Sequence, residues 1–363
     1  MTYIIIFFLI IFWWKHTNKG SIKQIKQFIV LVWLLFVSII GLRCVQTGQD
    51  TLMYREIYNG LNEYSSYKNF MLDFNFVNSI EVGYATWQWI VHLLFDYRGF
   101  LICQAILMIT PFVYVVYKWS DNVVWSFVLY ILLGYLTWNM CAARQAPAVS
   151  FTLLAYYFYS YKRYKACIVS YLIAISFHTT ALLFFPVVLI YKLLRNKKLL
   201  LISLVASKII GNYFIPMILP YMRIDYSDDV LSGSVGQLTY FGFLAVLLYC
   251  LFLEKVYKVV LPNTFYMFSV MLILWPLVDT IAAAFRITFY FMIYLCFAIP
   301  TILNELRDKK LEIARRLFLF SVSIIFSVYF YNMNLKQNGG RHVQPYYSVF
   351  EYSDNETKNL YKD

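Results

Sequence analysis

The chain has 363 residues, of which 61% are hydrophobic and only 14% are charged, whereas a soluble domain has roughly 45–50% apolar and about 25% charged residues. This composition excludes an ordinary soluble protein and indicates a chain whose main solvent is the lipid bilayer. The net charge of +12 does not indicate nucleic-acid binding, because the Lys and Arg residues form short clusters between apolar runs instead of one basic stripe.

Apolar runs suited to spanning a bilayer begin at the amino terminus and recur along most of the chain. We expect an all-α fold, a polytopic transmembrane helical bundle of about twelve spans. The expected spans are residues 1–14, 27–42, 99–117, 123–138, 147–161, 165–177, 180–191, 199–220, 238–253, 263–284, 287–304 and 317–333. Residues 1–333 are therefore interpreted as one transmembrane domain, and residues 334–363 as a polar tail.

One apolar segment, 82–95, is left outside this set. It is shorter than the ~20 residues that a spanning helix needs, and it contains Gln88 and His92. We expect it to enter the outer leaflet or to lie along it. The alternative is that it crosses, in which case residues 165–191 would have to form one long span.

The distribution of Lys and Arg predicts the orientation, because short basic loops stay in the cytoplasm. The loops expected there hold most of the basic residues: 15–26, 118, 162–165, 192–198, 255–258 and 307–316. Both termini then face outside, together with the loops 43–98 and 221–237.

The first candidate site element follows the second expected span, where Gly41-Leu-Arg43 is succeeded by Gly48-Gln-Asp50-Thr51. A charged side chain at membrane depth costs about 2.5–3.5 kcal/mol on insertion scales, so its presence needs a reason. A turn at Gly48 would bring Arg43 near Asp50. The structural alternative is an arginine at a helix end and an aspartate that caps the next helix.

The second candidate element is the turn that contains Arg144-Gln145-Ala-Pro147. Pro147 suits the first turn of a helix, so Arg144 and Gln145 are expected at its amino end, where backbone N–H groups favour an anion. A positive side chain gains nothing from the helix dipole at that end. The pattern therefore favours anion binding over a purely structural hairpin.

Three more polar residues are expected on the outer face: Glu81 at the start of segment 82–95, His178 before a Thr-Thr pair, and Arg286 between two apolar spans. A lone histidine is more often structural than catalytic, and the Thr pair would also serve as a helix cap. The shared side of His178 with Arg43 and Arg144 gives the functional interpretation its weight.

Separated arginines on one membrane face suit a diphosphate, because guanidinium groups bind phosphate oxygens bidentately and keep their charge. Asp50, Glu81 or His178 would accept or orient the proton of an acceptor hydroxyl, and the residues alone leave that choice open. No metal site and no cofactor are expected. Asp228-Asp229 is only a weak signal, and the six cysteines lack metal-ligand spacing.

In their order along the chain these motifs resemble the EpsG family of Wzy-type polysaccharide polymerases. The resemblance rests on Gly41-Leu-Arg43, Gly48-Gln-Asp50-Thr51-Leu-Met-Tyr54, Glu81-Val-Gly-Tyr84, Arg144-Gln145-Ala, Phe177-His178-Thr-Thr-Ala181 and Arg286. It implies a multi-pass enzyme of the bacterial cytoplasmic membrane that joins undecaprenyl-diphosphate-linked oligosaccharide repeat units into capsular or exopolysaccharide at the outer leaflet.

The resemblance also implies roles and partners. The outer loops 43–98 and 221–237 would be the substrate-facing elements. The implied catalytic residues are Arg43, Asp50, Arg144, His178 and Arg286, with the arginines on the diphosphate and Asp50 or His178 as base. The implied substrate-binding residues are Gly48, Thr51, Tyr54, Glu81, Gln145 and Tyr290. The implied partners are the lipid-linked oligosaccharide, the bilayer and other polysaccharide assembly proteins, without nucleic acid.

Two other functions fit parts of the pattern. A flippase or transporter for lipid-linked sugars should carry repeated spans and charges near mid-membrane, and only Lys208 is expected near the middle of a span. A polysaccharide O-acyltransferase would use His178, which has no acid beside it in the sequence. The polymerase is the favoured prediction, and a non-catalytic assembly role is the remaining alternative.

Overall fold

The computed structural model describes residues 2–17, 21–77, 80–218, 234–278, 282–335 and 341–352. Within these residues every regular element is a helix, and the one strand-like feature is an isolated antiparallel bridge between Arg43 and Ser348. The all-α prediction is confirmed. The chain divides into two compact units, which consist of Met1–Trp119, Tyr130–Thr179 and Phe330–Asp363, and of Ser120–Leu129 and Thr180–Tyr329.

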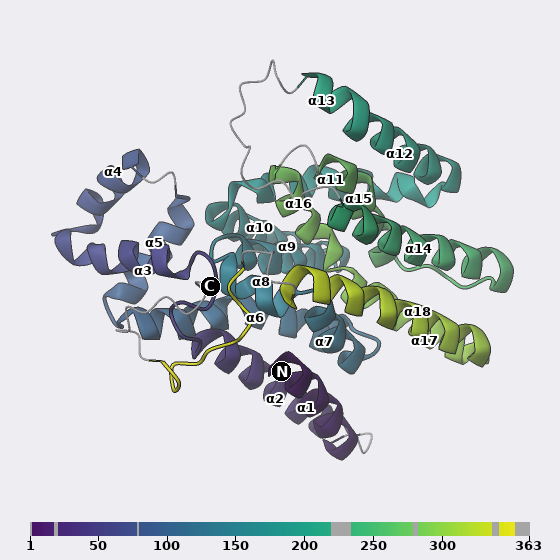
Figure 1. The fold of residues 1–363 in the computed structure, drawn as a ribbon, viewed down its shortest axis with the longest axis horizontal. Helices are drawn as coiled ribbons and strands as arrows, with labels where there is room; N and C mark the ends of the chain where they lie inside the picture. Colours follow the sequence, from purple (N-terminus) through teal and green to yellow (C-terminus); the bar gives the residue numbers. More distant parts are fainter. Residues whose placement is uncertain are drawn as a thin grey trace. The chain divides into compact units, whose positions relative to one another are not determined.

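The first unit pairs α1 with α2, α2 with α6, and α9 with both α6 and α10. Figure 1 shows α3, α4 and α5 beside one another in this unit. Its helices are α1 (Thr2–Thr17), α2 (Ile22–Gly41), α3 (Thr51–Gly60), α4 (Tyr67–Val77), α5 (Val82–His92), α6 (Tyr97–Trp119), α8 (Tyr135–Cys141), α9 (Gln145–Ser160) and α10 (Tyr164–Phe177), and α7 (Val123–Leu132) starts in the second unit and ends in the first.

The helix that leads to the first candidate element is fixed at both ends. At its start Ser21 forms a capping box with Gln24, which satisfies backbone N–H groups that have no partner inside the helix. Near its end Gly41 allows close packing on α6, because a Cβ there would lie 3.0 Å from the Cα of Ile102. The residues after Gly41 are therefore anchored to α6 from the start.

The second unit holds the remaining helices and an aromatic core, in which Phe243 contacts Trp275 and Phe326 with ring centroids 6.0 and 5.4 Å apart. Its helices are α11 (Phe184–Ile190), α12 (Lys197–Ile209), α13 (Ile215–Ile218), α14 (Ser234–Tyr257), α15 (Asn263–Leu274), α16 (Ala282–Met292), α17 (Leu295–Asp308) and α18 (Glu312–Phe330). Lys208 lies on α12 with its ammonium 4.8 Å from the ring centroid of Tyr240, a cation–π distance.

Single helical turns of other types complete both units. The 3₁₀ turns are Leu61–Glu63, Thr179–Leu183, Tyr191–Arg195 and Trp275–Leu277, and the π-helical turns are Ile210–Phe214 and Tyr331–Leu335.

The described residues contain six helices long and apolar enough to cross a membrane. They are Ile22–Gly41, Tyr97–Trp119, Lys197–Met217, Gly236–Tyr257, Ala284–Asp308 and Glu312–Met333. A seventh results if α7 and α8, which meet at a 52° bend, form one span, and Thr2–His16, Tyr164–Phe177 and Asn263–Leu277 are shorter apolar helices. The expected count of about twelve spans is not confirmed, because several of the expected spans form helices shorter than 18 residues.

Segments that were predicted to lie between or after the spans are partly described by the structure. Loop 43–98, which the charge distribution predicts to lie outside, contains the helices α3, α4 and α5. With 11 residues, α5 is ~16 Å long, too short to cross a hydrocarbon core of ~30 Å alone. Asp228-Asp229 and most of loop 221–237 lie outside the described residues. The C-terminal residues 341–352 pack within the first unit.

Candidate functional site

Four polar side chains of the first unit meet where separate helices begin or end: Tyr54, Glu81, Arg144 and His178, here called the Glu81 cluster. Tyr54 lies in the first turn of α3, and Glu81 immediately precedes α5. Arg144 immediately precedes α9, and His178 immediately follows α10. Because α9 and α10 form a hairpin, its two open ends place Arg144 and His178 together.

The carboxylate of Glu81 is the centre of the cluster. Its Oε2 accepts a hydrogen bond from Arg144 Nη1 at 2.8 Å, and its Oε1 lies 2.6 Å from His178 Nδ1. The backbone N–H of Thr179 also donates to Oε1, at 3.2 Å. One carboxylate therefore joins a guanidinium to an imidazole, although the three residues are far apart in the sequence.

The environment of Glu81 keeps this carboxylate charged. Burial alone would raise the pKa of Glu81, but the hydrogen bond and charge of His178, together with the charge of Arg144, lower it to about 2. The side chain is only 9% exposed. At neutral pH the buried group is therefore an ionised carboxylate, able to orient both partners.

Close packing of α5 on α10 brings Glu81 within reach of His178. A Cβ placed on Gly83 would lie 2.2 Å from Ser176 Oγ and 2.6 Å from the Ser176 carbonyl oxygen, so only glycine fits there. Glu81 occupies the N-cap position of α5 but makes no side-chain cap bond. Its carboxylate is directed to His178 and Arg144 instead.

The guanidinium of Arg144 has both a fixed side and an open side. Its Nε donates to Tyr54 Oη at 2.8 Å, and its Nη1 binds Glu81. Burial opposes the charge, yet the attraction and hydrogen bonds of Tyr54 and Glu81 outweigh it and raise the Arg144 pKa. The side chain is 24% exposed, and within the described part of the chain Nη2 has no hydrogen-bond partner, which leaves a charged donor for an anion.

The two ring nitrogens of His178 have different surroundings. Because Nδ1 faces a carboxylate, a neutral ring carries its proton on Nδ1 and leaves the Nε2 lone pair as the acceptor. His178 Nε2 is buried and has no hydrogen-bond partner among the described residues. A carboxylate, a histidine and an unpaired Nε2 form the arrangement that general-base catalysis requires.

Tyr54 fixes the position of Arg144. Its ring packs edge-on against that of Tyr84, with centroids 5.3 Å apart, and burial raises the pKa of Tyr54 to about 12 despite the nearby charge of Arg144. The phenol therefore stays protonated at neutral pH. Its oxygen accepts the Arg144 Nε–H, which holds the plane of the guanidinium.

Arg43, which the sequence grouped with the catalytic residues, is only 3% exposed and has different partners. Its Nε donates to the Thr47 carbonyl at 3.0 Å, its Nη1 to the Ile40 carbonyl, and its Nη2 to Thr51 Oγ1 at 3.4 Å. Burial lowers its pKa from the ordinary arginine value. These bonds join the end of α2 to the start of α3, so this guanidinium supports the chain around it.

The other predicted residues of the same loop and of the start of α9 have local surroundings of their own. Asp50 is the N-cap residue of α3 and lies half-buried. Gly48 has a φ of +101°, and a Cβ there would lie 2.3 Å from the Met140 carbonyl. Thr51 Oγ1 donates to the Thr47 carbonyl at 3.1 Å. Gln145 is buried as the first residue of α9.

Arg286 and Tyr290 belong to the second unit. Both lie on α16, where Arg286 is exposed and Tyr290 is buried. The hydroxyl of Tyr290 lies 3.0 Å from Thr180 Oγ1. The Glu81 cluster lies wholly in the first unit.

Sequence reasoning missed the acid that accompanies His178. The sequence shows no acid beside this histidine, and the structure supplies Glu81 from 97 residues earlier. The available signal was the position of Glu81 directly before an apolar segment too short to span. No group of three or more His, Cys, Asp or Glu side chains suited to a metal ion occurs in the described residues.

Comparison with known proteins gives one match. The family described as the EpsG family matches residues 26–353, a range that contains all the candidate site residues and the C-terminal residues 341–352. No curated protein and no solved structure matches the chain.

Proposed function

Because the chain belongs to the EpsG family, we propose that it is a membrane polysaccharide polymerase of the glycosyltransferase type. Its substrates would be undecaprenyl-diphosphate-linked oligosaccharide repeat units, and its product a capsular or exopolysaccharide. The single observation that carries the reaction is the Glu81 carboxylate that joins Arg144 to His178.

The cluster supplies the two groups that glycosyl transfer from a lipid diphosphate needs, a base and a cation. A hydroxyl of the acceptor sugar attacks the anomeric carbon of the donor, and the bond from that carbon to the diphosphate oxygen breaks. His178 Nε2 takes the hydroxyl proton, and Glu81 stabilises the imidazolium that forms. Arg144 stabilises the negative charge on the departing diphosphate through its exposed amino group.

The residues around these groups support them or extend the site. Tyr54 holds the guanidinium of Arg144, and Arg43 supports the loop that leads to Tyr54. Asp50 stays near the cluster without a bond to His178, so Glu81 is preferred as the acid. Arg286, on α16 of the second unit, remains a proposed phosphate-binding residue in its own right.

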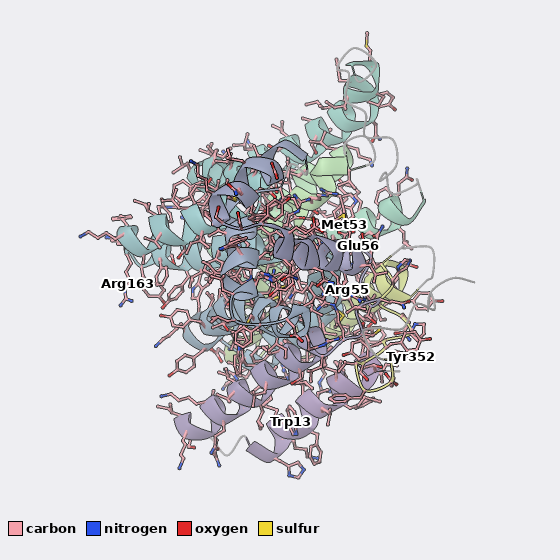
Figure 2. All side chains as sticks on the ribbon, turned by 90° about the vertical axis from the view of Figure 1, so that its left-hand side faces the viewer. Trp13, Met53, Arg55, Glu56, Arg163 and Tyr352 are labelled. Carbon is pink, nitrogen blue, oxygen red and sulfur yellow. The ribbon has the colours of Figure 1, made fainter. Side chains whose placement is uncertain are left out.

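The placement of the cluster supports activity at the outer leaflet. Its residues are in contact, so they share one membrane depth and one side. The opposite end of the α9–α10 hairpin carries Lys162 and Arg163, and Figure 2 shows Arg163 reaching away from the fold. Short basic loops stay in the cytoplasm, which supports an outer position of the Glu81 cluster.

The test is a comparison of lipid-linked intermediates in a strain that lacks the gene and is complemented with variants. His178→Ala and Arg144→Ala are expected to accumulate in the membrane, to abolish long polymer and to leave single repeat units on the outer leaflet. His16→Ala, an exposed histidine at the end of α1, is the matched control and should restore polymer.

Two outcomes would contradict the proposal. Normal polymer from both cluster variants would remove the catalytic role. Single repeat units confined to the inner leaflet would favour a flippase, because translocation and not polymerisation would then be the missing step.

A further inference from the structure

We propose that residues Arg341–Tyr352, here called the C-terminal strap, are a positioning element of the Glu81 cluster. The inference rests on the proposed function, and it assigns a role to a segment whose composition predicted only a polar tail. The strap ends at Tyr352, which is labelled in Figure 2.

The strap binds the loop between α2 and α3, residues 42–50, here called the Arg43 loop. The two segments run antiparallel, with Arg43 opposite Ser348. Four backbone bonds join them: Cys44 N to Tyr347 O at 2.9 Å, Gly48 N to His342 O at 2.8 Å, Gln49 N to Arg341 O at 3.1 Å and Val349 N to Leu42 O at 2.9 Å. The strap therefore supplies partners for backbone groups that no helix satisfies.

Side chains attach the strap to the same region. Tyr346 Oη donates to the Ile39 carbonyl at 2.9 Å, near the end of α2. Tyr3 Oη of α1 donates to the Val343 carbonyl at 2.8 Å. The strap is thus fixed to two helices as well as to the loop.

One path leads from the strap to Tyr54. The Arg43 loop continues directly into α3, where Thr51 N donates to the Gly48 carbonyl and Tyr54 N to the Asp50 carbonyl, both at 3.1 Å. The N–H of Gly48 donates to the His342 carbonyl of the strap, while the carbonyl of Gly48 accepts from Thr51. A shift of the loop would therefore move the first turn of α3 and, with it, the phenol that holds Arg144.

A second path leads from the strap to Arg144. Cys141 Sγ, in the last residue of α8, donates to the Arg341 carbonyl at 3.3 Å. Only two residues separate Cys141 from Arg144. Gly48 also approaches the Met140 carbonyl so closely that a Cβ would lie 2.3 Å from it. The strap therefore contacts the residues that precede both partners of the Tyr54–Arg144 hydrogen bond.

Two truncations test this role. A chain that ends after Gly340 loses the strap, and a chain that ends after Tyr352 keeps it, so the second is the matched control. We expect the first to make at least ~10-fold less polymer per molecule in the membrane, since a ~1 Å displacement of catalytic groups costs up to about 10²-fold in rate. The control should make normal polymer.

A rescue variant separates positioning from folding. Val349→Pro removes the N–H that donates to Leu42, after an extended residue that proline tolerates. Tyr347→Cys places a thiol opposite Cys44, at the ~5.5 Å Cα separation of paired antiparallel residues, which a disulfide can bridge. We expect Val349→Pro alone to lower polymer yield. The double variant that combines Val349→Pro with Tyr347→Cys should recover the yield when it is oxidised, but not when it is reduced.

The outcomes test the positioning role of the strap separately from the proposed polymerase reaction. Recovery on oxidation supports positioning. Three results overturn it: normal polymer from the chain that ends at Gly340, failure of Cys44 to form a disulfide with the thiol that Tyr347→Cys introduces, and a disulfide in the double variant that does not restore polymer. Disulfide yield is read by mass spectrometry and does not depend on catalysis, so a failed polymerase proposal would leave that result interpretable.

Discussion

Arg43 and Arg144 both follow an apolar helix of the first unit, but their guanidinium groups lie in opposite environments. Arg43 is 3% exposed and donates to two backbone carbonyls and to Thr51. Arg144 has a 24% exposed side chain and pairs with the carboxylate of Glu81. A helix-end arginine is thus not identified as a phosphate ligand by its position alone, because the partners of its guanidinium decide whether it supports the fold or remains open to an anion.

The largest expected effect is a difference between substitutions of the two arginines. Arg144→Lys should lower polymer synthesis by about 10²-fold, because an ammonium cannot hold Tyr54, Glu81 and a phosphate oxygen in one plane. Arg43→Lys should instead lower the free energy of unfolding by about 1–3 kcal/mol, since one ammonium leaves buried acceptors unpaired. Polymer yield per molecule and thermal unfolding in detergent are measured for both variants. Equal losses of stability would contradict the different roles assigned to Arg43 and Arg144.

The next effect concerns the charge of Glu81. Glu81→Gln should reduce polymer by about 10–100-fold, as is typical when an orienting carboxylate is lost. Because the folded pKa is about 2 and lies below the unfolded value of ~4.3, the carboxylate contributes stability above pH ~4.3, and this contribution is lost as the pH falls towards 2. The wild-type advantage over Glu81→Gln in unfolding experiments should shrink as the pH falls from about 5 towards 2. An advantage that stays constant over this acid range would contradict the assignment.

A smaller effect tests the packing that brings Glu81 to His178. Gly83→Ala should push α5 away from Ser176 and lower polymer by about 10-fold, because a modest displacement of catalytic groups is costly. Gly60→Ala is the matched control, since its Cβ would meet nothing within 4 Å, and it should stabilise the chain by at most about 1 kcal/mol. Equal polymer yields from the two variants would show that the α5–α10 contact does not control the cluster.

The smallest effect is expected at Lys162, an exposed basic residue in the loop between α9 and α10. Its φ of +58° is a conformation that glycine adopts at lower cost than lysine. Lys162→Gly should therefore raise the free energy of unfolding by up to about 1 kcal/mol and leave polymer yield unchanged. A loss of polymer here would mean that basic residues far from the Glu81 cluster also contribute to the reaction.

The sequence predicted those features that depend on residue type and local spacing. Composition gave the all-α membrane class, and the turn before Pro147 gave a helix that begins beside Arg144. His178 and Glu81 were also singled out, because polar residues next to apolar runs are rare. Their hydrogen bond was not predictable, since it depends on how closely α5 packs against α10 at Gly83.

Other features lacked any side-chain signal. The strap binds the Arg43 loop mainly through backbone groups, which every residue possesses, so the sequence of residues 341–352 shows only a polar tail. The environment of Arg43 was missed for a similar reason, because its partners are mainly carbonyl oxygens. The expected span count is not confirmed where apolar runs fold into short helices and 3₁₀ turns, as at 180–191.

The most direct test of the central claim is a double-mutant cycle between Glu81→Gln and His178→Ala. The quantity to measure is the rate at which the purified protein releases undecaprenyl diphosphate from a lipid-linked repeat unit. If Glu81 acts through His178, each single variant should lose most of the rate and the double variant should be no slower than His178→Ala. Losses that multiply in the double variant would show that the two residues act independently, and would contradict a Glu81 cluster that works as one unit.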